Sequence, residues 1–300
     1  MLTLEDICHG YGLLIGLTSY RLVNGRYQQT RITQAYALIM NVVVICTLPF
    51  VFWDIANGVR LGPWLPGKMD IVPFVLYIVD YAVIAYILVS RCQRDSVVKD
   101  ILDLSDRLTR NMDRAGLRPN PQLRRLLHLK SFTLAYMNIS SVATMLFQQS
   151  GVLKTLQNSF AYSILNITTY FYFASNWQIA RGYDCLNQQL GSGRTSEEEI
   201  RNLWSLHLLL GRMAQRINRI YGLQMLVCRL DYIICDIVGG YISIIFQNQG
   251  FNFRVVHATS ILLARSLDFF INDLICELSQ RYQCHPKDEA SERIMSQAVR

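Results

Sequence analysis

Long apolar runs constrain this chain more than any other feature of its sequence. A helix needs roughly 20 mainly apolar residues to cross the hydrocarbon core of a bilayer, because every backbone polar group must be paired inside the lipid. Six such runs are present, at residues 33–53, 71–90, 131–150, 159–180, about 224–246 and 255–276. The sequence therefore predicts an all-α fold, a polytopic transmembrane helical bundle with six spans in this chain.

The distribution of charge supports this interpretation and orients the bundle. Charged residues make up only 17% of the chain, below the roughly 25% that is typical of soluble domains. Of the 29 Lys and Arg residues, 23 fall on one side of the predicted membrane and four on the other. Basic loops stay in the cytosol, so this asymmetry predicts that both termini are cytoplasmic. It also accounts for the net charge of +7, and we expect no nucleic-acid partner.

The orientation divides the chain into segments on either side of a lipid bilayer. We expect a cytoplasmic N-terminal segment (1–32), a six-helix transmembrane domain (33–276) and a cytoplasmic C-terminal tail (277–300). Within the transmembrane domain, segments 91–130 and 181–223 would form long cytoplasmic helix extensions. No cysteine falls in a predicted outer loop, so structural disulfides are not expected. The predicted location is the plasma membrane, with multiple passes.

An amphipathic helix is predicted in the second cytoplasmic segment. Its apolar residues recur at alternating steps of three and four, with Arg212, Arg216 and Arg219 on the opposite face. We name the following set the anchor stripe: Leu203, Leu206, His207, Leu210, Met213, Ile217, Ile220 and Tyr221. No breaker follows, so the helix should continue into the run at 224. We expect the stripe to pack in a shared intracellular bundle; the alternative is a helix lying on lipid headgroups.

Several charged residues lie inside the predicted spans, where an isolated charge costs at least a few kcal/mol. Counted from the inner ends of the antiparallel last two spans, Asp236 and Arg265 come to a similar depth. Asp268 lies three residues from Arg265 on the same predicted helix. We therefore predict that Arg265 forms an ion pair with Asp236 or Asp268.

This pair has two interpretations. It either only fixes helix packing, or belongs to a ligand cavity that is also lined by aromatic side chains. On the second interpretation, the ligand-binding set is Asp80, Tyr77, Tyr81, Tyr162, Tyr170, Asp236, Tyr241 and Arg265. Tyrosine alone is weak evidence, because it is common at membrane interfaces.

Motifs for other chemistry are not found. The sequence contains no G-x-x-x-x-G-K-[ST], H-E-x-x-H or G-x-S-x-G, and no spaced Cys/His set. We therefore expect no enzyme, no cofactor and no metal. A potassium-channel filter and a voltage-sensor repeat are also missing.

One short stretch resembles a known family. The anchor stripe and the residues that follow it resemble the segment leading into the fifth span of insect gustatory receptors, on the residues Leu203, His207, Leu210, Asn218, Tyr221, Gly222, Gln224 and Leu226. The cytoplasmic N-terminus, short outer loops and long inner loops are also similar. The resemblance implies a subunit of a homo- or hetero-tetrameric ligand-gated cation channel in a chemosensory neuron, with other gustatory receptor subunits as partners. Its small-molecule tastant would be bitter or otherwise aversive.

The chain departs from that family in one respect. The family's seventh span, with its TY, five apolar residues, QF hallmark, is missing, and the stretch after Cys276 resembles the segment that precedes it. We therefore expect a C-terminally truncated receptor that does not conduct alone. Two other interpretations are open: a six-span transporter, for which the internal repeats are not evident, and a non-conducting partner that assembles with full-length receptors.

Overall fold

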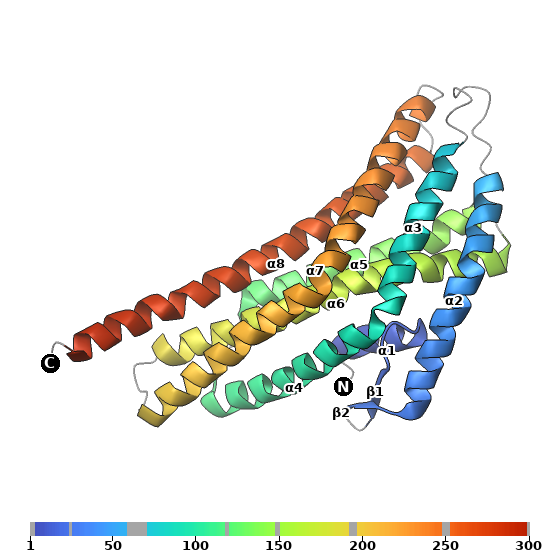
Figure 1. Cartoon of the computed structure of the whole chain (residues 1–300). Coiled ribbons are helices and arrows are strands. Elements are labelled where there is room, and N and C mark those ends of the chain that lie inside the picture. Colours follow the sequence, from blue (N-terminus) through green and yellow to red (C-terminus); the bar gives the residue numbers. More distant parts are fainter. Residues whose placement is uncertain are drawn as a thin grey trace. The chain divides into compact units, whose positions relative to one another are not determined.

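The computed structural model describes residues 4–23, 26–58, 71–117, 120–147, 151–191, 197–247 and 253–298 (Figure 1). Within these residues the chain forms eight helices and one hairpin. In chain order they are α1 (Leu4–Leu14), β1 (Tyr20–Val23), β2 (Arg26–Gln29), α2 (Arg31–Gly58), α3 (Val72–Val89), α4 (Arg91–Ala115), α5 (Pro121–Phe147), α6 (Val152–Gly191), α7 (Glu197–Gln247) and α8 (Phe253–Ala298). The prediction of a helical fold is confirmed.

Each predicted apolar run falls on one helix, namely α2, α3, α5, α6, α7 or α8. Helix α7 continues for 51 residues without a break, as the lack of a breaker before residue 224 predicts. Helix α8 likewise extends to Ala298, so most of the predicted tail at 277–300 is helical. The run at 131–150 ends three residues beyond α5, outside the described residues.

The hairpin is a correction to the purely α-helical prediction. Strands β1 and β2 pair antiparallel, with Val23 opposite Arg26. The sequence signal for it is the Asn24-Gly25 pair between the two strand segments, the strongest short-range hairpin signal. Just before β1, the Ser19 hydroxyl donates a hydrogen bond to Asp95 Oδ2 at 2.7 Å, which ties the hairpin to the first residues of α4.

The chain forms two compact units, which are described separately. The first comprises Met1–Asp95, Ser131–Tyr170 and Leu223–Phe269; the second comprises Ser96–Lys130, Phe171–Gly222 and Phe270–Arg300. In the second unit, an apolar core forms from residues of α5, α6 and α8, namely Leu123, Phe173, Ala180, Ile271 and Ile275. Helix α4 also buries an apolar face, whose residues follow one another at steps of three and four: Val97, Ile101, Leu104 and Leu108.

Helix α4 ends at Ala115. Gly116 follows with a φ of 62°, a left-handed conformation that glycine adopts without a Cβ penalty. The Leu117 amide then donates to the Met112 carbonyl at 3.1 Å. The glycine therefore caps the helix, and it is this cap that sets the end.

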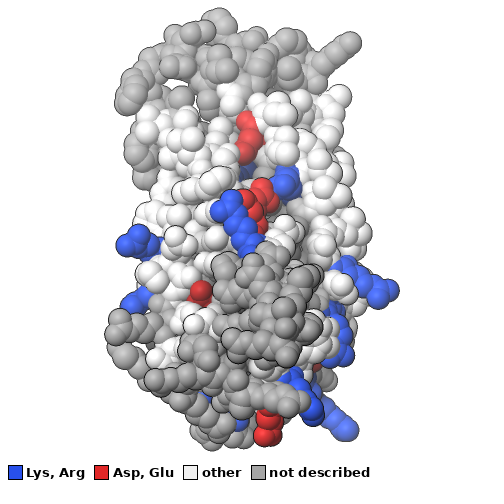
Figure 2. All heavy atoms as spheres, turned by 90° about the vertical axis from the view of Figure 1, so that its left-hand side faces the viewer, with Lys and Arg blue, Asp and Glu red and all other residues white. Residues whose placement is uncertain are grey.

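The first unit exposes many large apolar side chains. On α2 they include Ile39, Val42, Phe50 and Trp53. Figure 2 shows another face, seen from the left-hand side of Figure 1, on which most of the described surface carries no charged residue. Among the described helices, α2 alone is long and apolar enough to cross a membrane by itself, over Arg31–Asn57. Helices α3 and α4 pass the same criterion only when they are counted together as one bent span. An exposed apolar surface of this extent suits contact with lipid.

Candidate functional site

A group of buried and half-buried polar side chains lies within the first unit, where α3, α6, α7 and α8 each contribute. We name it the polar cluster: Asp80, Tyr162, Asp231, Cys235, Asp236 and Arg265. Asp80 is 1% exposed. Its Oδ2 accepts a hydrogen bond from the Tyr162 hydroxyl at 3.2 Å, and its Oδ1 lies 3.9 Å from the Cys235 thiol, which donates to it. Helices α3, α6 and α7 therefore meet at this carboxylate.

Arg265 supplies the positive charge of the cluster. Its Nη1 lies 3.7 Å from Asp236 Oδ1. The guanidinium also lies 4.9 Å from the ring centroid of Tyr232 and 6.0 Å from that of Tyr162. Tyrosine rings attract a cation through their negative faces. The arginine is therefore held by one carboxylate and two aromatic rings, and cation–π contacts of this kind gain strength away from water.

Asp268, the other partner considered for Arg265, has different neighbours. Its carboxylate accepts hydrogen bonds from the Thr133 hydroxyl at 3.2 Å and the Thr169 hydroxyl at 3.1 Å. Asp268 is fully buried. A buried carboxyl needs such donors to replace water, and here α5 and α6 supply them.

The predicted ligand-binding set is only partly brought together. Asp80, Tyr162, Asp236 and Arg265 lie in the polar cluster. The hydroxyl of Tyr81 instead donates to the Ile45 carbonyl on α2 at 3.3 Å.

The remaining tyrosines of that set differ in their surroundings. Tyr77 stacks against Phe52 with ring centroids 4.8 Å apart, and Tyr170 is fully buried. The side chain of Tyr241 lies outside the described residues.

Sequence reasoning missed two members of the cluster, Asp231 and Cys235. They lie four residues apart on α7, a spacing that puts both on one helix face. Together with Asp80 they form a group whose carboxylate and thiol atoms lie within 4.8 Å of one another. The D-x-x-x-C spacing was a signal in the sequence, but the third member comes from α3 and shares no local motif with it.

A hydrogen-bonded chain of neutral side chains adjoins the cluster. The Tyr232 hydroxyl donates to Asn166 Oδ1 at 2.8 Å, and Asn166 Nδ2 donates to Asn138 Oδ1 at 3.2 Å. Ser163 donates to the same Asn138 oxygen at 3.0 Å, and its hydroxyl contacts that of Tyr11 at 2.7 Å. The chain links α1, α5, α6 and α7 and satisfies polar groups that would otherwise be buried alone.

The anchor stripe lies in the second unit. Leu203, His207, Leu210, Met213, Ile217 and Tyr221 are buried, and Leu206 and Ile220 partly so. The His207 ring contacts Tyr183 of α6 edge-on, with centroids 5.6 Å apart, and burial raises the pKa of Tyr183 to about 12. Leu203 packs against Leu186 and Leu190. The stripe therefore forms part of the chain's own core.

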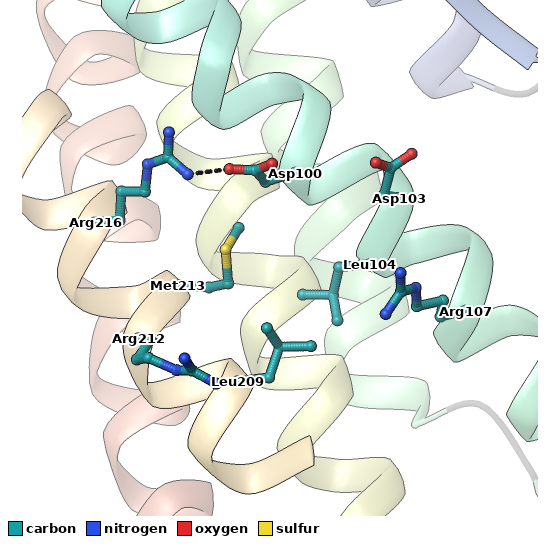
Figure 3. A pocket seen from close by; sticks show the side chains of 8 residues that line it. All are labelled: Asp100, Asp103, Leu104, Arg107, Leu209, Arg212, Met213 and Arg216. Carbon is teal, nitrogen blue, oxygen red and sulfur yellow. Dashed lines mark hydrogen bonds and ion pairs between the residues drawn. The ribbon is translucent and has the colours of Figure 1, made fainter. Parts of the chain in front are cut away.

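A pocket of about 340 Å³ opens between α4 and α7 in the second unit (Figure 3). Its lining is Asp100, Asp103, Leu104, Arg107, Leu209, Arg212, Met213 and Arg216. Arg216 forms an ion pair with Asp100 and donates to the Ser96 hydroxyl at 3.2 Å. The pair is partly exposed, so it contributes at most about 1 kcal/mol. Its role here is to connect the two helices.

Comparison with known proteins gives consistent matches. The family model described as 7tm chemosensory receptor matches residues 6–291. Gustatory receptor 59b of Drosophila erecta is 38% identical over 248 residues, which is 77% of this chain and 42% of that relative. The gustatory receptor for bitter taste 22e of Drosophila melanogaster is 29% identical over 124 residues, 40% of this chain and 32% of that relative. The chain thus spans less than half the length of these relatives.

Proposed function

The chain belongs to the 7tm chemosensory receptor family, and we propose that it acts as a gustatory-receptor-like subunit of a ligand-gated cation channel that senses small tastants. The resemblance to insect gustatory receptors is confirmed at the level of the family by the match to Drosophila gustatory receptors. These proteins are chemoreceptors of a membrane and not enzymes. The proposal includes channel activity, the class of ligand and the partner subunits. It also includes expression in a chemosensory neuron.

The proposed topology has six spans and cytoplasmic termini. It is supported by the concentration of 23 Lys and Arg residues on one predicted side and by the exposed apolar side chains of the first unit. Epitope tags on both ends give the test. We expect antibody access to either tag only after cells are permeabilised, and staining of intact cells would contradict the topology.

The polar cluster carries the proposal of a ligand site. Four of the residues predicted for a ligand cavity lie together in it, in helices whose outward faces are apolar. Ionisable groups in such helices are costly to bury and in general mark functional sites. We place the tastant next to Asp236 and Arg265, which are less buried than Asp80. The relative for bitter taste supports a bitter or aversive ligand.

Assembly with other receptor subunits is proposed to use the exposed face of α7. Because the anchor stripe is buried within the chain, the candidates are Ile200, Trp204 and Leu208, which are exposed and follow one another at steps of four. An apolar row of this kind on a water-facing helix suits a second helix of a receptor subunit. Replacing Trp204 with Gln should reduce co-purification with a full-length gustatory receptor, whereas Arg219→Gln on another face should not.

The experiment for ligand sensing uses the chain co-expressed with a full-length gustatory receptor in cultured cells. Calcium entry is recorded while a panel of bitter compounds is applied, and surface biotinylation measures the amount of each variant. Asp236→Asn should shift the concentration for half-maximal response by tenfold or more, because it removes one charge beside Arg265. Asp103→Asn, on the exposed surface of α4, is the matched control.

The possible results distinguish the ligand site from the role as a receptor subunit. A shift for Asp236→Asn with an unchanged control would support the ligand site. Equal responses from both variants at equal surface levels would contradict it. Responses identical with and without this chain would contradict the proposed role as a receptor subunit.

A further inference from the structure

Three metal-binding side chains lie together inside the first unit. Asp80 of α3 and Asp231 and Cys235 of α7 present ligand atoms that all lie within 4.8 Å of one another. Both aspartates are almost fully buried, at 1% and 2% exposed. We propose that these three residues form a binding site for a divalent transition-metal cation of the zinc class.

The state of Asp231 points independently to a bound cation. No N–H, alcohol or phenol group of the described residues donates to its carboxylate oxygens, and both are shielded from solvent. Its one side-chain partner among these residues is another carboxyl group, that of Asp80. Buried carboxylates normally accept such bonds or are paired with a cation. The polar atoms next to Asp231 are the Asp80 carboxylate and the Cys235 thiol. The Asp231 carboxylate therefore faces two groups that commonly bind metal ions, and neither of them is a strong hydrogen-bond donor.

The balance of charge in the polar cluster also favours a bound cation. Asp80, Asp231 and Asp236 contribute three carboxyl groups, and Arg265 is the cation that acts on all three. Its ion pair is with Asp236, which leaves the other two carboxylates without a direct cationic contact among the described residues. A divalent ion between Asp80 and Asp231 would neutralise both. Two like charges that are buried side by side without such an ion repel each other and disfavour the ionised state of both.

The donor set selects the class of metal. A thiolate with two carboxylates suits Zn²⁺, Co²⁺ or Cd²⁺, whereas Mg²⁺ and Ca²⁺ prefer oxygen ligands alone. Zinc takes four ligands in a tetrahedral arrangement, so three side chains leave one position for water. The Tyr162 hydroxyl, which donates to Asp80, would orient that ligand from outside the coordination sphere.

Binding is tested on the purified full chain in detergent, so the measurement does not depend on receptor activity. Co²⁺ is titrated into the protein, and the absorption band of a cobalt–thiolate bond is recorded. We expect saturable binding of one equivalent, displaced by Zn²⁺. Cys235→Ser should abolish the band, and Asp231→Asn should weaken binding by about tenfold to a hundredfold. Cys228→Ser, a change of another buried thiol on the same helix, should leave it intact.

Circular dichroism and gel filtration establish that each variant is folded. Loss of the band in Cys235→Ser with its retention in Cys228→Ser would support the site. A band that survives Cys235→Ser, or wild-type protein that binds no Co²⁺, would overturn it. A higher melting temperature of metal-free Asp231→Asn, together with no binding to the wild type, would show that the two carboxyls share a proton instead.

Discussion

The two ends of helix α7 bury opposite kinds of side chain. In its first half, within the second unit, the buried face is mostly apolar, with Leu203, Leu210, Met213 and Ile217, and Arg212, Arg216 and Arg219 are exposed. In its second half, within the first unit, the buried face is mostly polar, with Gln224, Cys228, Asp231 and Tyr232. There the exposed side chains are Leu223, Leu226, Leu230, Ile233 and Ile237.

This inversion indicates a change of solvent along one continuous helix. A helix in water hides its apolar stripe, whereas a helix in lipid can present apolar residues outward and directs costly polar groups toward protein. The change occurs between Ile220 and Leu223. We therefore infer that α7 leaves the cytosol and enters the membrane there. The anchor stripe is then buried away from water, and the polar cluster is buried away from lipid.

The largest loss of stability is expected when Arg265, the cation of the polar cluster, is removed. Arg265→Ala leaves Asp236 and its buried neighbours without a positive charge, at a cost of about 3–5 kcal/mol. We expect little monodisperse protein after detergent extraction, measured by fluorescence-detected gel filtration. Arg219→Ala, on the water-facing half, should behave like the wild type. Normal yield of Arg265→Ala would mean that the cluster is hydrated and not enclosed.

A matched pair of leucines probes the inversion itself. Leu208 and Leu230 lie on the same helix and are 50% and 52% exposed. Leu230→Lys should cost about 2.5–3.5 kcal/mol, because lysine must enter lipid, whereas Leu208→Lys should change stability by less than about 0.5 kcal/mol. Membrane insertion of glycosylation-tagged chains measures the difference. Equal tolerance of both lysines would remove the distinction between the two halves.

A smaller effect is expected at the buried carboxylate of Asp268. Thr169→Val keeps the shape of the side chain but removes a hydroxyl whose proton is shared between Asp268 Oδ2, at 3.1 Å, and the Asn166 carbonyl, at 2.8 Å. The lost hydrogen bond should lower the free energy of unfolding by about 1–2 kcal/mol, seen as a lower melting temperature in detergent. Thr47→Val on α2, whose hydroxyl bonds only within its own helix, is the control. An unchanged melting temperature would show that water replaces the Thr169 hydroxyl.

The smallest effect concerns the pH dependence of stability. Burial lowers the pKa of His9 from 6.5 to about 4, against the opposing pull of Asp6. Folding therefore favours the neutral ring, so its contribution is present above pH 6.5 and is lost as pH falls toward 4. The loss should be about 1–2 kcal/mol, since the ring is part-exposed. His9→Gln should flatten thermal stability across this window, and His128→Gln should not.

The helical architecture was predictable because apolar runs and periodic stripes are local signals. The lengths of α7 and α8 follow from the lack of breakers. The hairpin cannot be read from hydropathy, and its one local signal in the sequence is the Asn24-Gly25 turn. Only part of the polar cluster was foreseen: depth counting put Arg265 beside Asp236, but the rotation of α8 that directs Asp268 to Thr133 depends on packing.

The grouping of Asp80 with Asp231 and Cys235 was out of reach for the same reason. The two residues on α7 share a face, which sequence spacing shows, but their partner on α3 is about 150 residues earlier. Only tertiary structure brings the three together. The burial of the anchor stripe within its own chain also needed coordinates, because a heptad pattern does not reveal which helix covers it.

Spin-label accessibility along α7 tests the inferred change of solvent most directly. A nitroxide is attached to p-acetylphenylalanine placed in turn at Leu208, Arg212, Leu226 and Leu230 in protein reconstituted into liposomes, which leaves the native cysteines unmodified. Collisions with oxygen, which concentrates in lipid, are compared with collisions with a water-soluble nickel chelate. The account predicts preference for nickel at Leu208 and Arg212 and for oxygen at Leu226 and Leu230. Nickel access to Leu230 as high as that to Leu208 would contradict it.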